Sequence, residues 1–560
     1  MIFLSLHVEL KSPDKMKKKI LSSILFLMAF TAFAQKELSK DYSYTVSEPY
    51  KVFDADEKYY FAKDGELMTV KLDKRDVLIQ KFRNESEKPA FTGEKLYEDF
   101  PKNIQFEDII EFNDKFYFFY SSWDGGNVEK EQLFAREINF KTGEFVGEGK
   151  LLFKVDGKVT GSPLSQIFIG FAPGINIGVK DKFDFLVSYD KKRMLIQYRK
   201  KPEVKSDVKS YDIIGMNAFE GDLKMTYSSE VKMPYTERRM DNLDYSIDKE
   251  GNAYILAKVY HDDSNDDKKK RKDKEANYHV ELLRIKAGSK EIVKTKIEIK
   301  DKFINEIWLF ESSENYMVCA GFYNKGKTAS NADGIMVFKV KKDGDVYDKY
   351  THEIPVEVLN DYVKEKTKKK NIEKDEDEDG IEFKNLVLRD LFIGEDGSIV
   401  LTGEQYFSKV HYNGKTTYTT YHYNDILITK IDNKGGLAWM KKLPKRQVGT
   451  KGQGGMSFKH IAANDNHYLL FLDNVKNYEL PLDKTPALHS DGKGGYFTSY
   501  KISDTDGSST NSSVFNVRDV EDMTIYQFGI GRIVQSSEDE FVVEVYKKKK
   551  EDVMIKIKIK

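Results

Sequence analysis

The sequence predicts an all-β protein, a β-propeller of seven or eight four-stranded blades. Two observations predict this fold class. The 560 residues include 33 Tyr and 36 Phe but only 12 Pro, a composition that favours strands over disorder. A plan of four strands and three turns also recurs at a spacing of about 60 residues, and radial repetition of such sheets is how propellers protect their edges. Two smaller β domains are the alternative architecture.

The stretch 386–447 shows the repeated plan most clearly. Its expected strands are Leu386–Ile393, Ser398–Tyr412, Lys415–Ile431 and Leu437–Lys442, separated by turns rich in Gly, Asp and Asn. Runs of β-branched and aromatic residues between such turns are typical of strands. One four-stranded meander cannot bury both of its faces alone, so we expect it to pack against its own repeats.

The turn between the second and third of these strands is expected at Asn413-Gly414. Asn-Gly is the strongest sequence signal for a two-residue type I′ turn, because both central residues need positive φ. Such a turn would place Tyr412 opposite Lys415 and Tyr406 opposite Tyr421.

Seven further stretches repeat the plan with different lengths. The last of them lacks a fourth strand, and Tyr42–Val46 is expected to supply it and to close the ring between the two termini. This gives eight blades, or seven if the first stretch is not a whole blade. The stretches are Tyr50–Phe82, Ile104–Val155, Ile175–Tyr235, Leu243–Ile299, Glu306–Ile354, Phe458–Val517 and Ile530–Lys560.

The N-terminus has the pattern of a secretory signal peptide. Lys17, Lys18 and Lys19 form a basic start, Ile20–Phe33 is an apolar segment, and Ala-Phe-Ala stands before Gln35 as a cleavage signal. A short buried helix is the alternative. We therefore expect residues 1–34 to be a signal peptide, with Met16 as a candidate for the true start.

The mature chain, residues 35–560, is expected to be a single exported β-propeller domain, with the periplasm favoured over the cell surface or the medium. It has no apolar run of the roughly 18 residues that a membrane-spanning helix needs. Charged insertions near 261–275 and 356–380 are expected to be solvated loops, the second of them beginning with a helical pattern. Cys319, the single cysteine, is expected to be a buried and inert thiol.

Charge and motif content argue against several classes of function. The first 34 residues carry five Lys and two acids, so their removal shifts the formal net charge from −1 to −4. A nearly neutral chain of this size argues against a general nucleic-acid binder. The sequence indicates no cofactor, metal site or catalytic motif: it has no HExxH, no GxSxG, and no Glu at the last position of a calcium loop beginning at Asp504. His460 and His467 flank a turn and are expected to approach each other as a structural pair.

Eight segments carry a resemblance to a known family. They are MPYTERRMDN, YSIDKEGNAYILAKVY, LRDLFIGEDGSIVLTGEQY, TTYTTYHYNDILITKID, LAWMKKLPKRQ, KGQGGMSFKH, LFLDNVKN and FVVEVYKKKKEDV. Together they resemble an uncharacterised family of exported Bacteroidetes proteins with propeller-like β repeats, from about Asp181 to Lys560. The resemblance implies an exported, propeller-like protein, and it implies no functional residues, because the family has no established activity.

The first candidate binding site is the ribbon, which we define as Tyr406–Tyr423. A Tyr-rich ribbon that is exposed can stack on sugars or contact a protein partner. Cross-strand aromatic pairing that stabilises a protruding hairpin is the alternative. The candidate residues are Tyr406, Tyr418, Tyr421, His422 and Tyr423.

The second candidate is the connector, which we define as Lys445–Met456. Glycine-rich backbone close to cations can hold an anion. The segment is not a P-loop, because no Gly-Lys-Ser/Thr closes it, and a flexible linker between blades is the alternative. The candidate residues are Lys445, Arg446, Lys451, Gly452, Gly454 and Gly455.

These observations predict an exported cell-envelope protein that binds an envelope protein or glycan, and they favour a non-catalytic role. The alternative is a carbohydrate-active hydrolase or lyase with carboxylates at the centre of the ring. Acids are abundant in the chain, and the sequence alone does not show which of them lie together. A deep pocket with converging acids would favour the enzyme, and a shallow aromatic or basic face would favour binding.

Overall fold

The computed structural model describes residues 38–560, except 85–86, 125, 127–128, 162–181, 203, 269–274, 300, 315, 327–329 and 376–380. The predicted signal peptide and the strand expected at Ile175 therefore lie outside the described residues. Within the described ranges, no helix is long and apolar enough to cross a membrane.

The described strands form eight sheets, and almost all of their pairings are antiparallel. The first four sheets contain β3 (Glu57–Lys63), β4 (Glu66–Asp73), β5 (Asp76–Arg83) and β6 (Ala90–Tyr97); β7 (Ile104–Phe112), β8 (Lys115–Asp124), β9 (Lys130–Asn139) and β10 (Glu144–Asp156); β11 (Asp184–Val187), β12 (Arg193–Arg199), β13 (Tyr211–Glu220) and β14 (Lys224–Thr236); and β15 (Met240–Ile247), β16 (Ala253–Tyr260), β17 (Tyr278–Ile285) and β18 (Ile292–Ile297).

The other four sheets include two that gain extra strands from neighbouring loops. They contain β19 (Phe303–Glu311), β20 (Tyr316–Asn324), β21 (Gly334–Lys341) and β22 (Val346–Glu353); β23 (Leu386–Ile393), β24 (Ile399–Tyr412), β25 (Thr417–Ile431) and β26 (Leu437–Leu443), with β27 (Gln447–Gly449) and β30 (His489–Ser490); β28 (Lys459–Ala463), β29 (Asn466–Asp473), β31 (Tyr496–Ser503) and β32 (Ser509–Asn516); and β33 (Ile533–Ser537), β34 (Glu540–Lys548), β35 (Glu551–Ile559) and β1 (Tyr42–Val46), with β2 (Tyr50–Lys51).

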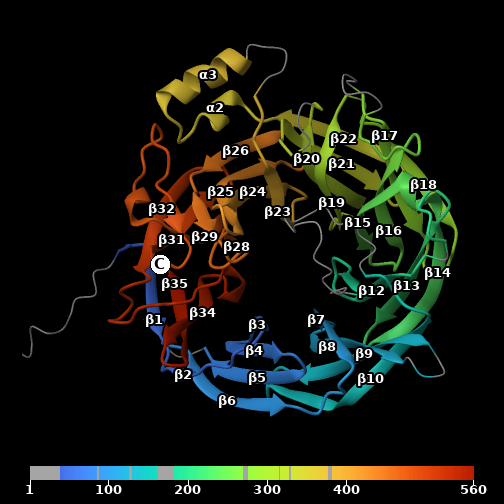
Figure 1. The fold of residues 1–560 in the computed structure, drawn as a ribbon, viewed down its shortest axis with the longest axis horizontal. Helices are drawn as coiled ribbons and strands as arrows, with labels where there is room; N and C mark the ends of the chain where they lie inside the picture. The colour runs from blue at the N-terminus through green and yellow to red at the C-terminus, as the bar shows by residue number, and fades with distance from the viewer. Residues whose placement is uncertain are drawn as a thin grey trace, which may run out of the picture.

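The sheets stand side by side around a common centre, so the fold is propeller-like (Figure 1). The all-β prediction is confirmed. Strands that come first in their sheets, such as β3, β7, β23 and β28, lie nearest the centre. The predicted closing strand is also confirmed: β1 pairs with β35, with Tyr42 opposite Ile559 and Val46 opposite Ile555. One hydrogen-bonded sheet thus joins the two ends of the described chain.

The core lies between neighbouring sheets, and β20 shows why. Side chains alternate along a strand, so Met317 and Cys319 pack with residues of the β15–β18 sheet, whereas Val318 and Ala320 pack with residues of the β23–β26 sheet. All four side chains are fully buried. Because β20, the second strand of its sheet, is covered on both faces, its sequence is a nearly continuous apolar run. The prediction of a buried Cys319 is confirmed.

The antiparallel order gives the ring two different faces. Turns between first and second strands, and between third and fourth strands, emerge on one face, which we call the short-turn face; examples are Asp64-Gly65 and Asn113-Asp114. Loops between second and third strands and the connections between sheets emerge on the other, the long-connection face. The charged insertion near 261–275 lies between β16 and β17, and helices α2 (Val356–Leu359) and α3 (Glu365–Asp375) lie between β22 and β23. The helical start expected for the second insertion is therefore confirmed.

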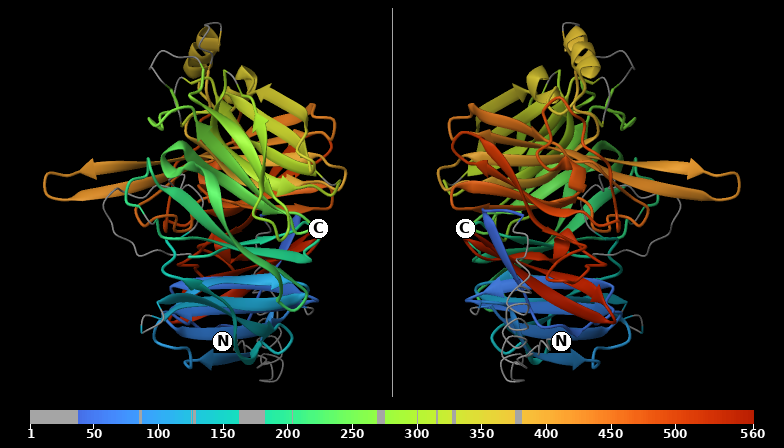
Figure 2. Two further views of the ribbon diagram at one scale, coloured as in Figure 1. Left: turned by 90° about the vertical axis from the view of Figure 1, so that its right-hand side faces the viewer. Right: turned by 90° about the vertical axis from the view of Figure 1, so that its left-hand side faces the viewer.

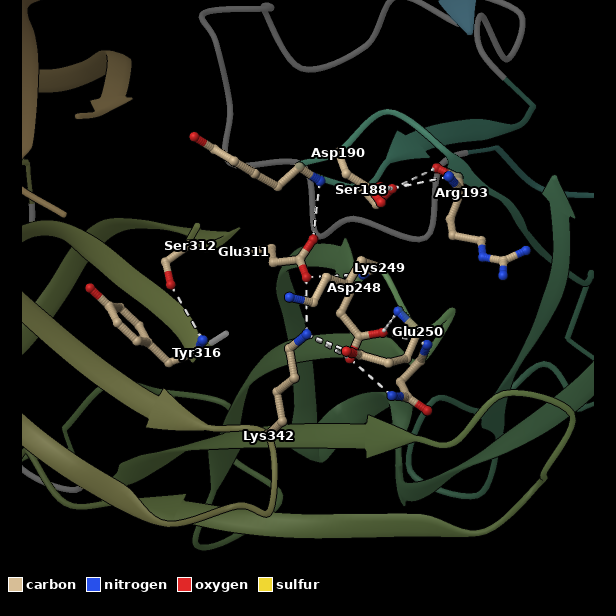
Figure 3. A network of polar contacts seen from close by, with 12 residues as sticks. Ser188, Asp190, Arg193, Asp248, Lys249, Glu250, Glu311, Ser312, Tyr316 and Lys342 are labelled. Carbon is tan, nitrogen blue, oxygen red and sulfur yellow. Dashed lines mark hydrogen bonds and ion pairs between the residues drawn. The ribbon is translucent and has the colours of Figure 1, made fainter. Parts of the chain in front are cut away.

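On the short-turn face, polar contacts tie adjacent sheets together (Figure 3). The Glu311 carboxylate, only 6% exposed at the end of β19, accepts hydrogen bonds from the backbone N–H groups of Tyr189 at 3.0 Å and Lys249 at 2.9 Å. The Lys342 ammonium lies 3.0 Å from the same carboxylate. One side chain therefore joins turns from three consecutive sheets.

A second set of ties lies along the inner strands at the centre of the ring. β15, β19 and β23 each carry a β-bulge, next to Asp244, Glu306 and Asp390 respectively. The Asp244 carboxylate accepts from the Leu309 N–H of the next inner strand at 2.6 Å, and the Glu306 carboxylate accepts from the Leu388 N–H of the strand after that at 2.7 Å. Burial raises the pKa of Asp244 to about 7, against the opposing effect of its backbone hydrogen bonds. Each bulge aims an acid at the neighbouring sheet.

Candidate functional site

A cavity on the long-connection face has a volume of about 750 Å³ and lies where three sheets meet. One wall comes from the connector after β26, a second from the loop between β29 and β31, and a third from the connection between β32 and β33. The polar or charged side chains in its wall include Thr420, Lys451, Ser490, Asp491, Gln527 and Arg532. These segments are far apart in the sequence and are brought together only by the ring.

The ribbon and the connector, predicted as two separate candidates, are one structure. β27 of the connector pairs with β25 of the ribbon, with Tyr421 opposite Gly449 and Tyr423 opposite Gln447. β30, from the loop between β29 and β31, then pairs with β27 in parallel. Figure 2 shows the β24–β25 hairpin standing far out from the ring, in orange. The hairpin therefore rises beside the cavity, and Thr420 belongs to both.

The turn at the tip of the ribbon differs from the predicted two-residue turn. β24 ends at Tyr412 and β25 begins at Thr417, so Tyr412 faces Thr417 and Tyr406 faces Tyr423. The expected register, with Tyr412 opposite Lys415 and Tyr406 opposite Tyr421, is wrong. The Asn413 side chain accepts hydrogen bonds from the N–H groups of Lys415 at 3.0 Å and Thr416 at 2.8 Å. This Asx-type turn needs positive φ only at Gly414.

The base of the ribbon is structural, and its outer part is open. Tyr423 is 5% exposed, and its ring lies 4.8 Å from that of Tyr406. Further out, Tyr418 stacks on His411 at 5.0 Å but remains 46% exposed, and Tyr412 is 73% exposed. Of the predicted ribbon residues, Tyr418 is therefore available to a partner and Tyr423 is not.

Two more of the predicted ribbon residues lie between these extremes. The His422 ring stacks on that of Phe407 at 4.6 Å. Tyr421, like His422, is only partly covered. Cross-strand ring pairing, the alternative to a binding role, thus accounts for part of the aromatic content of the ribbon.

Lys445 of the connector is not available to a ligand. Its side chain is fully buried, and its ammonium lies 2.6 Å from the Glu404 carboxylate. Burial lowers the pKa of Lys445, and the charge of Glu404 opposes this shift. Ser457 and Arg389 each donate to the same carboxylate at 2.8 Å. The prediction of Lys445 as a binding residue is therefore corrected to a buried structural role, whereas its neighbour Arg446 is exposed.

The glycines of the connector surround an anion, but that anion belongs to the chain. The Gly455 N–H donates to the Asp491 carboxylate at 3.0 Å. A Cβ atom added at Gly454, whose φ is +54°, would lie 2.1 Å from the other Asp491 oxygen. Gly452 has φ +61° and no atom within 4 Å of an added Cβ. Gly454 and Gly455 thus hold the loop against Asp491, while Gly452 stands free of such contacts.

Two cations complete the wall of the cavity. Lys451 is exposed at its edge. Arg532, at the end of the 3-10 turn η3 (Ile530–Arg532), has a buried Nη1 atom without a hydrogen-bond partner among the described residues. An unpaired guanidinium N–H group is unfavourable unless a ligand or water satisfies it. Arg532 and Asp491 could not be singled out from the sequence, because neither lies in a recognisable motif.

A second cavity, of about 690 Å³, lies at the centre of the ring and is lined by residues of β3, β23, β28 and β33. Asp390 lines it with a carboxylate 45% exposed and 2.7 Å from the Nδ1 atom of His460. The Nε2 atom of His460 lies 3.0 Å from the Nδ1 atom of His467, so the predicted histidine pair is confirmed. His467 continues the chain to Asp504 at 3.0 Å. Among the described residues, no group of three or more His, Cys, Asp or Glu is arranged to hold a metal ion.

Comparison with known proteins gives only distant likenesses. No family model and no curated protein matches the chain. A prolyl endopeptidase matches with 12% identity and a TM-score of 0.38, over 96% of this chain and 60% of that protein, so the chain spans about three fifths of its length. The polysaccharide lyase Uly1 matches with 9% identity and a TM-score of 0.36, over 95% of each chain. An oligogalacturonate lyase in complex with manganese matches with 8% identity and a TM-score of 0.31, over 82% of this chain and 97% of that one. Likenesses this weak identify neither an activity nor a ligand.

Proposed function

We propose that this chain is an exported, eight-bladed β-propeller of the cell envelope that binds a protein or glycan partner on its long-connection face without catalysing a reaction. The observation that carries the proposal is the pairing of β25 with β27, which joins the exposed hairpin and the glycine-rich connector at the edge of one cavity. A pocket of this volume is in the range used to hold ligands, and the projecting hairpin beside it extends the contact surface.

The proposed blade count and the proposed cellular location are supported by different observations. The eight sheets, together with the pairing of β1 and β35, favour eight blades over seven. The pattern of Met16–Ala34 and the family resemblance support export. Cell fractionation tests the address: we expect the protein in the periplasmic fraction, with cleavage before Gln35 shown by N-terminal sequencing. Retention of the uncleaved chain in the cytoplasm would contradict it.

Affinity capture from a native envelope extract tests the binding function. The structure defines a conservative truncation: Lys409 and Thr420 are cross-strand partners, so an Asn-Gly turn can replace Val410–Thr419 without disturbing the rest of the sheet. A second variant, Thr450→Trp, fills the cavity from an exposed lining residue. We expect both variants to lose the captured partner. Thr510→Trp, at an exposed position on the outer strand β32, is the matched control.

A second function is favoured by the central cavity. There Asp390 presents a half-exposed carboxylate held by His460, an arrangement that can accept a proton. A carbohydrate hydrolase or lyase would use it as a base. Incubation of the protein with polysaccharides separates the two functions: depolymerisation that Asp390→Asn abolishes would establish the enzyme and overturn the non-catalytic proposal.

A further inference from the structure

We propose that the ligand of the cavity beside the ribbon is an anionic polysaccharide, with an acidic group of one sugar on Arg532 and Lys451 and the adjoining sugars along the ribbon. This inference rests on the proposed function and specifies its ligand. It is carried by three features: the distribution of charge around the cavity, the Arg532 guanidinium in its wall, and the chemistry of the exposed ribbon.

The ribbon and the connector side of the cavity lack acids, whereas the β32–β33 connection on the other side carries exposed Asp519, Glu521 and Asp522. One third of the residues in the chain are charged, yet neither the ribbon, 406–423, nor the segment 433–464 contains a single Asp or Glu. The ribbon carries Lys409 and Lys415, both exposed. The connector adds exposed Arg446 and Lys451. On the ribbon and the connector, cations therefore stand without acids, and such a surface attracts ligands of negative charge.

Inside the cavity, the one acid in the wall is already engaged. Asp491 receives the Gly455 N–H and lies against Gly454. Arg532 also lines the cavity; its buried Nη1 atom is unpaired among the described residues, and its charge also acts on the Asp552 carboxylate behind it. A guanidinium offers a planar fork of donors that matches a carboxylate or a sulfate. The part of Arg532 that lines the cavity can therefore meet an incoming anion, which has to lie away from the Asp491 carboxylate in the same wall.

The walls suit a sugar better than a protein side chain. Six of the residues lining the cavity are glycines: Gly449, Gly454, Gly455, Gly492, Gly494 and Gly529. Most of them lie against other atoms of the chain, but Gly492 has nothing within 4 Å of an added Cβ atom, so a ligand can approach the backbone closely there. The lining residue Tyr526 is 41% exposed; the Lys548 ammonium lies 4.4 Å from the centre of its ring, and the other side of the ring can lie against a sugar.

The ribbon continues this surface away from the ring. Beyond Gln405, β24 runs seven residues to Tyr412, which at about 3.3 Å per residue is roughly 23 Å. That length accommodates several sugars in a row. Tyr418, whose ring is 46% exposed, lies on the same face of the hairpin as the cavity residue Thr420, whereas Tyr412 lies on the opposite face. A polymer anchored by one acidic sugar in the cavity can therefore lie along the hairpin.

Calorimetric titration of the intact protein with defined polymers tests the inference. The probes are polygalacturonate, its fully methyl-esterified and uncharged form, dextran sulfate, and single-stranded DNA. We expect binding of polygalacturonate or of dextran sulfate, which tells whether the anion is a carboxylate or a sulfate ester. The uncharged polymer is expected to bind about tenfold or more weakly. Equal binding of the uncharged form, preference for DNA, or no binding of any polyanion would overturn the inference.

Variants locate the contact. Arg532→Gln and Lys451→Gln are each expected to weaken polyanion binding about tenfold, whereas Lys484→Gln, which alters a 63% exposed lysine of the β29–β31 loop, leaves it unchanged. Because Arg532 is partly buried, its thermal melt is compared with that of the wild type. The exposed Lys451 gives the same test without risk to folding, and unchanged binding in the Lys451→Gln variant would overturn the inference. If polyanions fail but Thr450→Trp still abolishes partner capture, the ligand class is wrong and the proposed function stands.

Discussion

The two faces of the ring differ in what their loops do. On the short-turn face, turns are tight and a buried side chain such as Glu311 ties three of them together. On the long-connection face, loops vary in length, add the strands β27 and β30 to a neighbouring sheet, and surround a cavity. Under the proposed function, stability and binding are therefore carried by opposite faces, as expected when functional loops stand on a packed scaffold.

The largest effect on stability is expected from a substitution on the short-turn face. Glu311→Ala removes an acceptor from two backbone N–H groups and from Lys342. Breaking a buried ion pair by removing one partner lowers the free energy of unfolding by about 3–5 kcal/mol. Urea denaturation measures the loss, and Glu311→Gln, which keeps the shape, should lose less. Partner capture by the folded variant should be unchanged. Loss of capture without loss of stability would show that the short-turn face takes part in binding.

The acids at the centre of the ring predict a dependence on pH. Burial raises the pKa of Asp244 and of Glu107 to about 7 in the folded chain, whereas an unfolded chain releases these protons near pH 4. The folded state therefore binds more protons between these values, and its stability falls as the pH rises from 5 to 8. Each group contributes at most about 1.4 kcal/mol per pH unit.

Denaturation of the wild type and of Asp244→Asn at a series of pH values isolates this contribution. As the pH rises, the wild type should lose more unfolding free energy than Asp244→Asn does. A difference that stays constant from pH 5 to pH 8 would show that Asp244 titrates below this window.

A smaller effect is expected on the connector. Gly454→Ala places a Cβ atom 2.1 Å from an Asp491 oxygen at a positive φ, and we expect a loss of about 1–2 kcal/mol. Gly452→Ala is the matched control, since its φ is also positive but nothing lies within 4 Å. The excess loss in Gly454→Ala over Gly452→Ala, measured by thermal denaturation, reports the contact with Asp491. Equal losses would mean that the contact contributes nothing.

The smallest effect on stability is expected from the part of the molecule that projects furthest. Replacing Val410–Thr419 by Asn-Gly removes exposed residues that contact no other sheet in Figure 2. We expect the unfolding free energy to change by less than about 0.5 kcal/mol, while partner capture is lost. A large loss of stability with capture intact would reverse the roles assigned to the two faces.

Local patterns predicted what local physics controls. Turn residues marked the strand boundaries, the apolar run around Cys319 indicated a strand covered on both faces, and the missing fourth strand of the last repeat pointed to Tyr42–Val46. The turn at the tip of the ribbon was not predicted correctly from local sequence. Asn413-Gly414 has the sequence of a two-residue turn, yet the Asn413 side chain stabilises a longer one, and the register of the whole hairpin shifts with it.

The sequence by itself determined the all-β repeat, the closing strand and the two candidate binding segments, the ribbon and the connector. Only the tertiary structure decided that these stretches pair with each other, that Lys445 is buried against Glu404, and that Asp491 and Arg532 complete the cavity. The physical reason is range. Strand and turn preferences act over a few residues, whereas the cavity depends on loops from three sheets, whose positions are set by the packing of the entire ring.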